Sequence, residues 1–380
     1  MMRPMKLAGD RLLFGLDCLE HLKALSGKRA MIVKGRGTYL KDCGIQDKVC
    51  DYLEEAGMEI QIFSDVEPDP GFKTVLRGVR QMCEFGPDWI VALGGGSVMD
   101  AAKAMWIYYE NPELTTLEEI LPPNEIPKLR VKARLACIPS TAGSASEVSR
   151  SIVITDDENG TKHGIGNMEL MPDVAICDPE VTCSMTPSIT AETGLDALTH
   201  AVEAYLSKRA NYISDIFAIK AVKDIFIWLP KACADGGNMK NREQMLNASL
   251  VAGLAFTNVS LGIVHSIAHT LGSVFHLRHG LADAVVLPYV IRFNSQSAQA
   301  AARYAELARH IGSADFGEAV EMLGKQLKIP VDVGSLIGNR AAYEEKLNAM
   351  VRMALDDGCT KTNPVIPTEE QMKRLFLEIW

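Results

Sequence analysis

The chain has 380 residues, of which 47% are hydrophobic and 23% are charged, and its formal net charge at pH 7 is −9. A chain of this length can bury two hydrophobic cores, and an acidic balance without long basic runs argues against nucleic-acid partners and anionic membrane surfaces. No apolar stretch reaches the roughly 18 residues that a transmembrane helix needs, so no membrane partner is expected.

The N-terminus and the cysteines indicate the compartment. Met1–Lys6 lacks the apolar core and small-residue cleavage site of a signal peptide. The nine cysteines are scattered and include no C-x-x-C pair, which argues against a disulfide framework and a structural zinc site. We therefore expect a cytoplasmic protein with reduced thiols.

The first half of the chain alternates short apolar runs with helical stretches. Buried parallel strands are predicted at Ala30–Val33, Glu59–Phe63, Trp89–Leu93, Leu135–Ile138 and Val174–Cys177. This succession is typical of a Rossmann-like α/β fold with a parallel sheet, which we assign to residues 1–185.

Two glycine-rich turns follow predicted strands in this half. Gly94, Gly95 and Gly96 lead into a helical pattern that begins at Ser97 and includes Asp100. Bare backbone N–H groups at a helix N-terminus bind phosphate, although a plain tight turn is the alternative.

The other turn, with Gly35 and Gly37, is an incomplete G-x-G-x-x-G fingerprint because Leu40 replaces the third glycine. The two turns together indicate a dinucleotide-binding domain.

After Pro187 the pattern becomes helical, and residues 186–380 are predicted to form an all-helical domain. The expected helices are Thr190–Trp228, Arg242–Phe275, Ala282–Phe293, Ser297–Ile311, Phe316–Leu327 and Tyr343–Ala354.

Histidines gathered in this second half indicate a metal site. Asp196 and His200 are spaced i, i+4, here in the expected first turns of a helix, so that both side chains lie on one face. His265, on an apolar helix, and His279, on the turn after it, supply the other two candidate ligands. Three imidazoles and one carboxylate suit Fe(II), with Zn as the alternative, and do not suit Ca or Mg.

Two other histidines leave alternatives open. His276 is able to replace His279 as a ligand, and His269, one turn after His265, is either a ligand or a proton relay.

Six motifs, read in chain order, resemble the iron-containing (group III) alcohol dehydrogenases. They are Gly94-Gly95-Gly96-Ser97 with Asp100, Ala102 and Lys103; Pro139–Gly143; Ser146–Val148; Pro172–Ala175 with Asp178 and Pro179; Thr193 and Gly194 with Asp196, Ala197 and His200; and Gly262, His265, His269 and Gly272 with His279 and Gly280. The resemblance runs from about residue 10 to Asn363 and Pro364, nearly the whole chain.

The resemblance implies roles for individual residues. Metal ligands would be Asp196, His200, His265 and His279, and His269 would lie near the nicotinamide and complete the catalytic set with Asp196 and His200. The pyrophosphate loop would be Gly95, Gly96 and Ser97 with Asp100; Ser140, Thr141 and Ser144 would lie along the nicotinamide ribose and ring, and Lys162 would contact the cofactor. A homodimer or higher homo-oligomer is also implied.

The first glycine turn bears on the choice between NADP(H) and NAD(H). NAD-using relatives carry an acidic residue in this turn, which would bind the adenosine 2′-hydroxyl, whereas this chain has Lys34-Gly35-Arg36-Gly37-Thr38. The glycine leaves room for a 2′-phosphate and Lys34 or Arg36 is able to neutralise it, which favours NADP(H). The alternative is that both basic side chains point into water.

The resulting hypothesis is a metal-dependent, NAD(P)-linked alcohol dehydrogenase or aldehyde reductase. Hydride would pass between the nicotinamide and a small primary alcohol or aldehyde whose oxygen is bound to the metal, while His269 accepts the proton. The alternatives are a non-redox lyase of the dehydroquinate synthase-like type, a polyol (glycerol-type) dehydrogenase, and a catalytically silent metal-binding protein.

Overall fold

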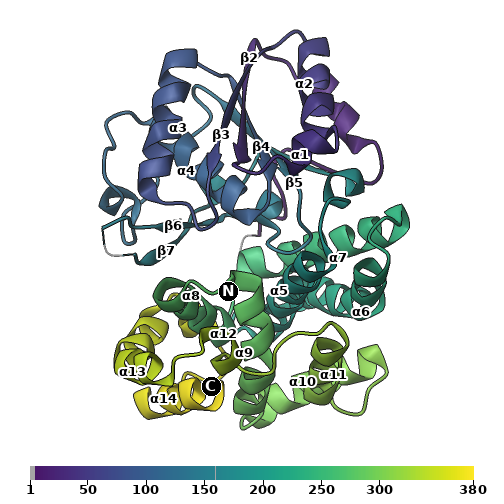
Figure 1. Ribbon diagram of the computed structural model, residues 1–380, viewed down its shortest axis with the longest axis vertical. Helices are drawn as coiled ribbons and strands as arrows, with labels where there is room; N and C mark the ends of the chain where they lie inside the picture. Colours follow the sequence, from purple (N-terminus) through teal and green to yellow (C-terminus); the bar gives the residue numbers. More distant parts are fainter. Residues whose placement is uncertain (1–4, 159) are drawn as a thin grey trace. The chain divides into compact units, whose positions relative to one another are not determined.

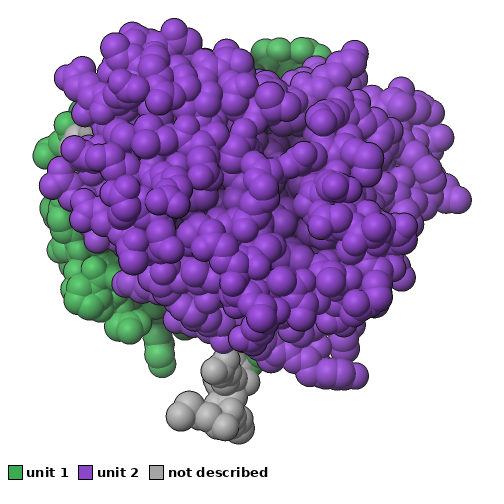
Figure 2. Space-filling model, turned by 90° about the horizontal axis from the view of Figure 1, so that it is seen from below, with its two compact units in different colours: residues 1–185 green, residues 186–380 purple. Residues whose placement is uncertain are grey.

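The chain divides into two compact units, Met1–Met185 and Thr186–Trp380, which are coloured separately in Figure 2. The structure is a computed structural model and describes residues 5–158 and 160–380. Met1–Pro4, part of the segment in which no signal peptide is expected, lie outside the described residues. The prediction of a parallel α/β first half and a helical second half is confirmed (Figure 1).

A six-stranded parallel sheet organises the first unit, in the order β1-β8-β5-β4-β2-β3. Its strands are β1 (Arg11–Phe14), β2 (Arg29–Gly35), β3 (Glu59–Val66), β4 (Trp89–Gly94), β5 (Arg134–Pro139) and β8 (Val174–Cys177). Each predicted run lies within one strand. The edge strand β1 and the separate antiparallel pair β6 (Ser151–Thr155) and β7 (Lys162–Gly166) were not predicted.

Helices cover both faces of the sheet. They are α1 (Tyr39–Asp42), α2 (Ile45–Glu55), α3 (Phe72–Phe85) and α4 (Gly96–Glu110), with short 3₁₀ helices η1 (Cys18–Ala24), η2 (Glu118–Ile120), η3 (Ser146–Val148), η4 (Met168–Leu170) and η5 (Pro179–Thr182). Alternation along β2 sends Ala30 and Ile32 into the core under η1 and α2, and Met31 and Val33 into the core under α3 and α4. Figure 1 shows α2 on one side of the sheet and α3 with α4 on the other.

The order of the strands reverses between β2 and β4. The chain runs from β2 outward to β3 and then returns to β4 on the other side of β2. In open parallel sheets, ligands bind beyond the carboxyl ends of the strands at such a switch point. Both glycine turns lie there, because Gly35 ends β2 and Gly94 ends β4.

The second unit is helical. Its helices are α5 (Pro187–Leu206), α6 (Tyr212–Ala234), α7 (Met239–Val259), α8 (Ile263–Phe275), α9 (His279–Asn294), α10 (Ala298–Ile311), α11 (Phe316–Gln326), α12 (Gly334–Ile337), α13 (Arg340–Asp356) and α14 (Glu369–Glu378), with η6 (Thr360–Thr362). Helix α5 is buried along most of its length and packs against α6, α7 and α9.

Two helices that were predicted as continuous are each broken. The predicted helix 190–228 is interrupted before α6, where the Asn211 side chain caps the new helix in a capping box with Ser214. The predicted helix 242–275 is interrupted at Ser260, whose φ of 65° is left-handed, and restarts after Gly262. This second break places His265 in the first turn of α8.

Among the described residues, no single helix is both long and apolar enough to cross a membrane. Only α7 and α8 taken together meet that criterion, by length and composition, and they are bent by 100° at the break between them.

Candidate active site

Three helices bring the four predicted metal ligands close to one another. Asp196 and His200 lie one turn apart in the middle of α5, not in its first turns as expected, because the helix already begins at Pro187. His265 lies in the first turn of α8. His279 was expected on a turn, but it is the first residue of helix α9.

One carboxylate oxygen lies near all three imidazoles. The distance from Oδ1 of Asp196 to the imidazole Nε2 atom is 3.6 Å for His200, 3.8 Å for His265 and 3.9 Å for His279. These separations exceed hydrogen-bond lengths. Ligand atoms that share one cation, at bonds of about 2.0–2.2 Å, lie roughly 3–4 Å apart, so the spacing suits a bound divalent ion.

Burial provides a test of whether these residues fit a metal. Asp196 is 4% exposed and His265 is 1% exposed. Within the described part of the chain, Oδ1 of Asp196 and Nε2 of His265 have no hydrogen-bond partner. An unsatisfied buried polar atom costs about 1–3 kcal/mol, and a cation between the two atoms would remove that cost. The donor set of imidazoles and carboxylate therefore fits iron(II) or zinc.

A second carboxylate, missed by the sequence reasoning, lies in the same group. Asp283 follows His279 by one turn of α9, and its Oδ2 is 3.1 Å from Nε2 of His279. Donor atoms of Asp196, His265, His279 and Asp283 all lie within 4.8 Å of one another. Burial and the neighbouring Asp196 carboxylate raise the pKa of Asp283 well above its usual value. The i, i+4 spacing from His279 was the available signal.

His200 lies at the side of this four-residue group. Its ring stacks between Phe256, at 4.4 Å between centroids, and His265, at 4.7 Å. The apolar Phe256 ring therefore lies directly beside a candidate ligand.

Glu203, also missed, holds His265 in position. Its Oε2 lies 2.6 Å from Nδ1 of His265, and its Oε1 accepts a hydrogen bond of 2.7 Å from the Val264 N–H. Because Nδ1 is bound to the carboxylate, Nε2 of His265 is directed at the ligand group. Burial raises the pKa of Glu203 to about 7 and lowers the pKa of His265 well below its usual value, which favours the neutral imidazole that metals bind.

His269 pairs with a carboxylate, as His265 does. Its Nδ1 lies 2.8 Å from Oδ2 of Asp357, whose Oδ1 accepts the Cys359 N–H at 2.7 Å, and its ring stacks on His279 at 5.3 Å. Asp357 caps the C-terminal end of α13 and was not predicted as a site residue. His276, the open alternative to His279, is the C-cap residue of α8 and is not among the clustered donors of the described residues.

The glycine turn after β4 opens helix α4. Gly95 is the N-cap residue, and Gly96 and Ser97 are the first residues of the helix. A Cβ atom on Gly96 would lie 2.9 Å from Cβ of Ser144, and one on Gly95 would lie 3.3 Å from the Thr141 side chain. The predicted loop residues Thr141 and Ser144 therefore pack against this turn, and Gly96 must be glycine for them to approach.

The turn after β2 lies beside the same region. A Cβ atom on Gly35 would lie 3.7 Å from Val98 of α4. Tyr39, which follows Gly37, places its hydroxyl 3.1 Å from Oγ of the predicted residue Ser140. The predicted dinucleotide residues of the two turns are thus neighbours within the first unit.

Asp100 makes hydrogen bonds within the first unit. Its Oδ1 accepts a hydrogen bond of 2.7 Å from the Ser146 hydroxyl and its Oδ2 one of 2.9 Å from the Val153 N–H. Lys103, fully buried, donates to the carbonyls of Ser146, Ser149 and Ser151. Both side chains hold the segment after β5 against α4.

Charges around the Gly35 turn differ from the expectation. The turn itself has no carboxylate, but Arg36 pairs with Asp65 at 2.8 Å and with Glu67 at 3.1 Å, at the end of β3. Nζ of Lys34 donates to the Gly37 carbonyl at 3.1 Å. Lys34 is buried and therefore does not point into water, whereas the Arg36 side chain is 56% exposed and makes its ion pairs at the surface.

Lys162, the other predicted cofactor contact, lies on β7. Its Nζ pairs with Asp69 at 2.8 Å, and the N–H of Asp69 donates to Oγ of Ser97 at 3.3 Å. Lys162 is thus linked through Asp69 to the first turn of α4.

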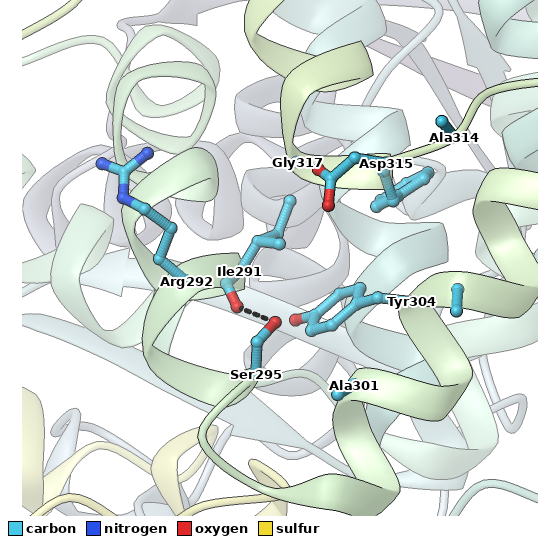
Figure 3. Close-up of a pocket in the computed structure, with 10 residues that line it drawn as sticks. Ile291, Arg292, Ser295, Ala301, Tyr304, Ala314, Asp315 and Gly317 are labelled. Carbon is cyan, nitrogen blue, oxygen red and sulfur yellow. Dashed lines mark hydrogen bonds between the residues drawn. The ribbon is translucent and has the colours of Figure 1, made fainter.

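A cavity of about 380 Å³ lies elsewhere, among α9, α10 and α11 (Figure 3). It is lined by residues that include Ile291, Ser295, Tyr304 and Phe316. The Ser295 hydroxyl donates to the Ile291 carbonyl at 2.7 Å. None of the predicted site residues lines this cavity, and we assign it no role in the chemistry.

Sequence comparison identifies the family. Residues 9–179 match the family model described as iron-containing alcohol dehydrogenase, and residues 190–380 match that described as Fe-containing alcohol dehydrogenase family, C-terminal. The chain is 42% identical over 372 residues to an NADPH-dependent butanol dehydrogenase of Clostridium saccharobutylicum, covering 96% of this chain and 94% of that protein. It is 37% identical over 380 residues to a 1-propanol dehydrogenase of Citrobacter freundii, covering 97% and 98%.

Other relatives are longer: the chain spans 44% of aldehyde-alcohol dehydrogenase 2 of Entamoeba histolytica, at 40% identity. A solved iron-containing alcohol dehydrogenase from Thermococcus thioreducens matches with a TM-score of 0.91 and 35% identity over 100% of this chain and 99% of the other. The chain therefore belongs to the iron-containing alcohol dehydrogenase family and is, as its motifs predicted, a metal-dependent, NAD(P)-linked alcohol dehydrogenase.

Proposed function

We propose that this enzyme uses Fe(II) and preferentially NADP(H) to interconvert short aliphatic aldehydes and primary alcohols. The observation that carries this proposal is the buried oxygen of Asp196, with three imidazole Nε2 atoms within 3.9 Å of it. The ion would be held by Asp196, His200, His265 and His279. When bound, a divalent cation supplies Lewis-acid polarisation of the substrate C–O group.

Residues around the ion have separate tasks in this proposal. Glu203 fixes the tautomer and direction of His265. His269 accepts the hydroxyl proton of the alcohol at Nε2, and donates it back during aldehyde reduction, because Asp357 occupies its Nδ1.

The dinucleotide would bind at the switch point of the sheet. Its pyrophosphate would accept hydrogen bonds from the backbone at Gly95, Gly96 and Ser97, where the positive end of the α4 dipole favours negative charge. Thr141 and Ser144, which pack against that turn, would contact the nicotinamide half.

The preference for NADP(H) rests on two observations. The Gly35 turn has no acidic residue for the 2′-hydroxyl, and a relative 42% identical is named for its NADPH dependence. The ion pairs of Arg36 with Asp65 and Glu67 oppose phosphate binding, so in this proposal the guanidinium exchanges one carboxylate for the 2′-phosphate.

The short aliphatic substrate rests on Phe256 and on the relatives. Stacked on His200 at 4.4 Å, Phe256 presents an apolar ring beside the metal ligands. Two relatives are named for butanol and propanol. A polyol substrate would need polar partners at the position of this ring.

Two wider expectations belong to the same proposal. No disulfide joins any of the nine cysteines, all of which lie in the described residues, and this supports a cytoplasmic enzyme.

Strand β1 lies at the edge of the sheet with Phe14 62% exposed, which supports a homodimer because such an edge favours pairing with another chain. Light scattering on the purified protein tests the dimer.

The direct test is nicotinamide absorbance with anaerobically purified, Fe(II)-loaded protein. NADPH and NADH are compared with propanal, butanal and glyceraldehyde. We expect NADPH oxidation with propanal and butanal, slower oxidation of NADH, and little turnover of glyceraldehyde. Faster turnover with NADH refutes the cofactor preference, and silence with every aldehyde refutes the proposed reaction.

A further inference from the structure

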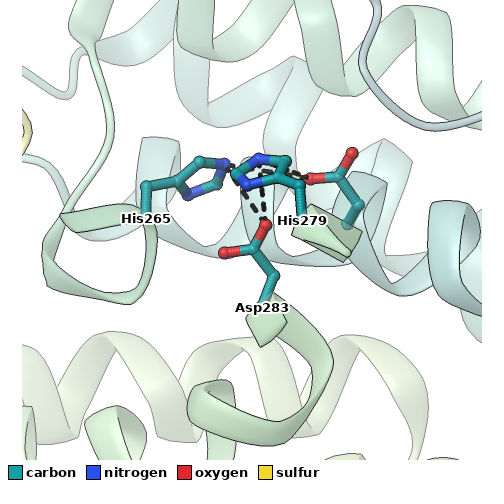
Figure 4. A group of neighbouring side chains, drawn as sticks. His265, His279 and Asp283 are labelled. Atoms are coloured by element: carbon teal, nitrogen blue, oxygen red, sulfur yellow. Dashed lines mark ion pairs between the residues drawn. The ribbon is translucent and has the colours of Figure 1, made fainter. Parts of the chain in front are cut away.

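The ligand group contains a second carboxylate that the four predicted ligands do not explain. Asp283 is fully buried, with 0% exposure, and lies one turn after His279 on α9. Its Oδ2 is 3.1 Å from Nε2 of His279 and 3.9 Å from Nε2 of His265. Figure 4 shows the Asp283, His265 and His279 side chains pointing toward one another.

The polar groups around this side chain are the candidate metal ligands themselves. Among residues 5–158 and 160–380, neither carboxylate oxygen of Asp283 has a hydrogen-bond partner. The carboxylate of Asp196 lies in the same group, and its donor oxygen is within 4.8 Å of that of Asp283. Two buried carboxylates facing each other repel, and a cation between them reverses that interaction.

The direction of Asp283 distinguishes a ligand from an outer partner. Glu203 is an outer partner, because it contacts Nδ1 of His265, the nitrogen turned away from the ligand group. Asp283 instead faces the Nε2 atoms of His265 and His279, which are the same atoms that face Oδ1 of Asp196. It therefore lies on the metal side of the imidazoles.

We propose that Asp283 is itself a ligand of the metal ion, together with Asp196, His265 and His279, whose donor atoms cluster with its own. His200, at the side of this cluster with its Nε2 3.6 Å from Oδ1 of Asp196, would complete a set of three imidazoles and two carboxylates. This inference rests on the metal centre proposed above. Two negative charges balance a divalent cation, and five protein donors disfavour the four-coordinate tetrahedral geometry typical of zinc. The fifth donor thus favours Fe(II) over Zn in this chain.

Cobalt(II) provides a readout that is independent of activity, because its visible absorption is strong in tetrahedral sites and weaker at higher coordination number. Metal-free protein is titrated with Co(II), and affinity and spectrum are recorded for the wild type, Asp283→Asn and Asp283→Glu. Two matched controls each neutralise one carboxylate: Glu203→Gln, the outer partner, and Asp224→Asn, which pairs with Lys220 on α6.

We expect Asp283→Asn to bind Co(II) at least tenfold more weakly and to absorb more strongly per ion, as the site loses one donor. Asp283→Glu, which keeps a carboxylate, retains the wild-type band shape and tests the proposal even if the Asn variant unfolds. Glu203→Gln weakens binding about 10–100-fold without changing the band shape, and Asp224→Asn changes neither.

If Asp283→Asn binds Co(II) with the affinity and spectrum of the wild type, Asp283 is not a ligand. The proposed centre of Asp196, His200, His265 and His279 is unaffected by that result. If the wild type itself binds no Co(II), the metal centre fails and Asp283 fails with it. Metal-free Asp283→Asn should melt no lower than the metal-free wild type, because the substitution removes the cost of burying an ionisable carboxyl group beside Asp196.

Discussion

Oδ2 of Asp357 lies 2.8 Å from Nδ1 of His269, joining the end of α13 to the helix that carries His265. Although burial acts in the opposite direction, His269 holds the pKa of Asp357 well below its usual value. The carboxylate therefore stays charged and fixes the imidazole, which leaves Nε2 as the nitrogen that exchanges a proton.

Replacing His269 separates its two candidate roles. We expect His269→Ala to lower kcat by about 10²–10⁴-fold while the bound metal, measured by plasma mass spectrometry, stays at the wild-type level. His310→Ala, on the outer helix α10, is the control and should keep wild-type kcat. Loss of the metal from His269→Ala would show that His269 is a ligand and not the proton carrier.

Gly262 is needed for the position of α8. A Cβ atom there would lie 2.6 Å from Oδ1 of Asn363 and 2.8 Å from Oε1 of Glu203. Gly262→Ala should therefore displace Glu203, weaken metal binding and lower the free energy of unfolding by about 1–3 kcal/mol. Gly358→Ala, where nothing lies within 4 Å of the added Cβ, is the control. Equal thermal midpoints for the two metal-loaded variants would contradict this account.

The buried Glu147 makes stability depend on pH. Burial raises its pKa from 4.5 to about 7, and in the described structure its Oε2 has no hydrogen-bond partner. Between these pH values the folded state binds more protons than the unfolded state, so the free energy of unfolding falls as pH rises, by on the order of 2–3 kcal/mol.

Urea unfolding from pH 4.5 to 8, compared for the wild type and Glu147→Gln, checks this. The neutral variant should show a smaller decline, because Glu203 and Asp283, whose pKa values burial also raises, still contribute, and it should exceed the wild type in stability at pH 8. Parallel stability curves would show that Glu147 does not cause the dependence.

Arg36 tests the cofactor preference. If it binds the 2′-phosphate, Arg36→Ala should raise the KM for NADPH about 10–100-fold, since a hydrogen bond to a charged group contributes about 1.5–3 kcal/mol, and should leave the KM for NADH nearly unchanged. Arg77→Ala is the matched control, because Arg77 pairs with the other oxygen of the same Asp65 carboxylate. Equal effects of Arg36→Ala on both cofactors would remove the role assigned to it.

Much of the fold was predictable because buried parallel strands are unbroken apolar runs, as at Trp89–Leu93. The edge strand β1 was missed because it has four residues with a half-exposed pattern. The break before α8 was missed because distant residues make it: Glu203 binds the Val264 N–H across 61 positions, and Asn363 binds the Ile263 N–H across 100.

The sequence predicted residues of the candidate site only where the spacing of the residues indicates a chemical role. Asp196 and His200 share a helix face at i, i+4, and the glycines after β4 mark a helix start. Glu203 and Asp357 act through contacts with residues far away in the sequence, which local patterns do not encode. Asp283 had the spacing, but one carboxylate after a histidine is too common a pattern to single out.

The most direct test of the metal centre is to remove the metal and return it. Chelation should abolish aldehyde-dependent NADPH oxidation, and Fe(II) added under anaerobic conditions should restore it at one ion per chain in the wild type but not in His265→Ala. NADPH binding, followed by its fluorescence, should persist in the metal-free protein. Full activity after complete metal removal, or activity in metal-free His265→Ala, would contradict the account.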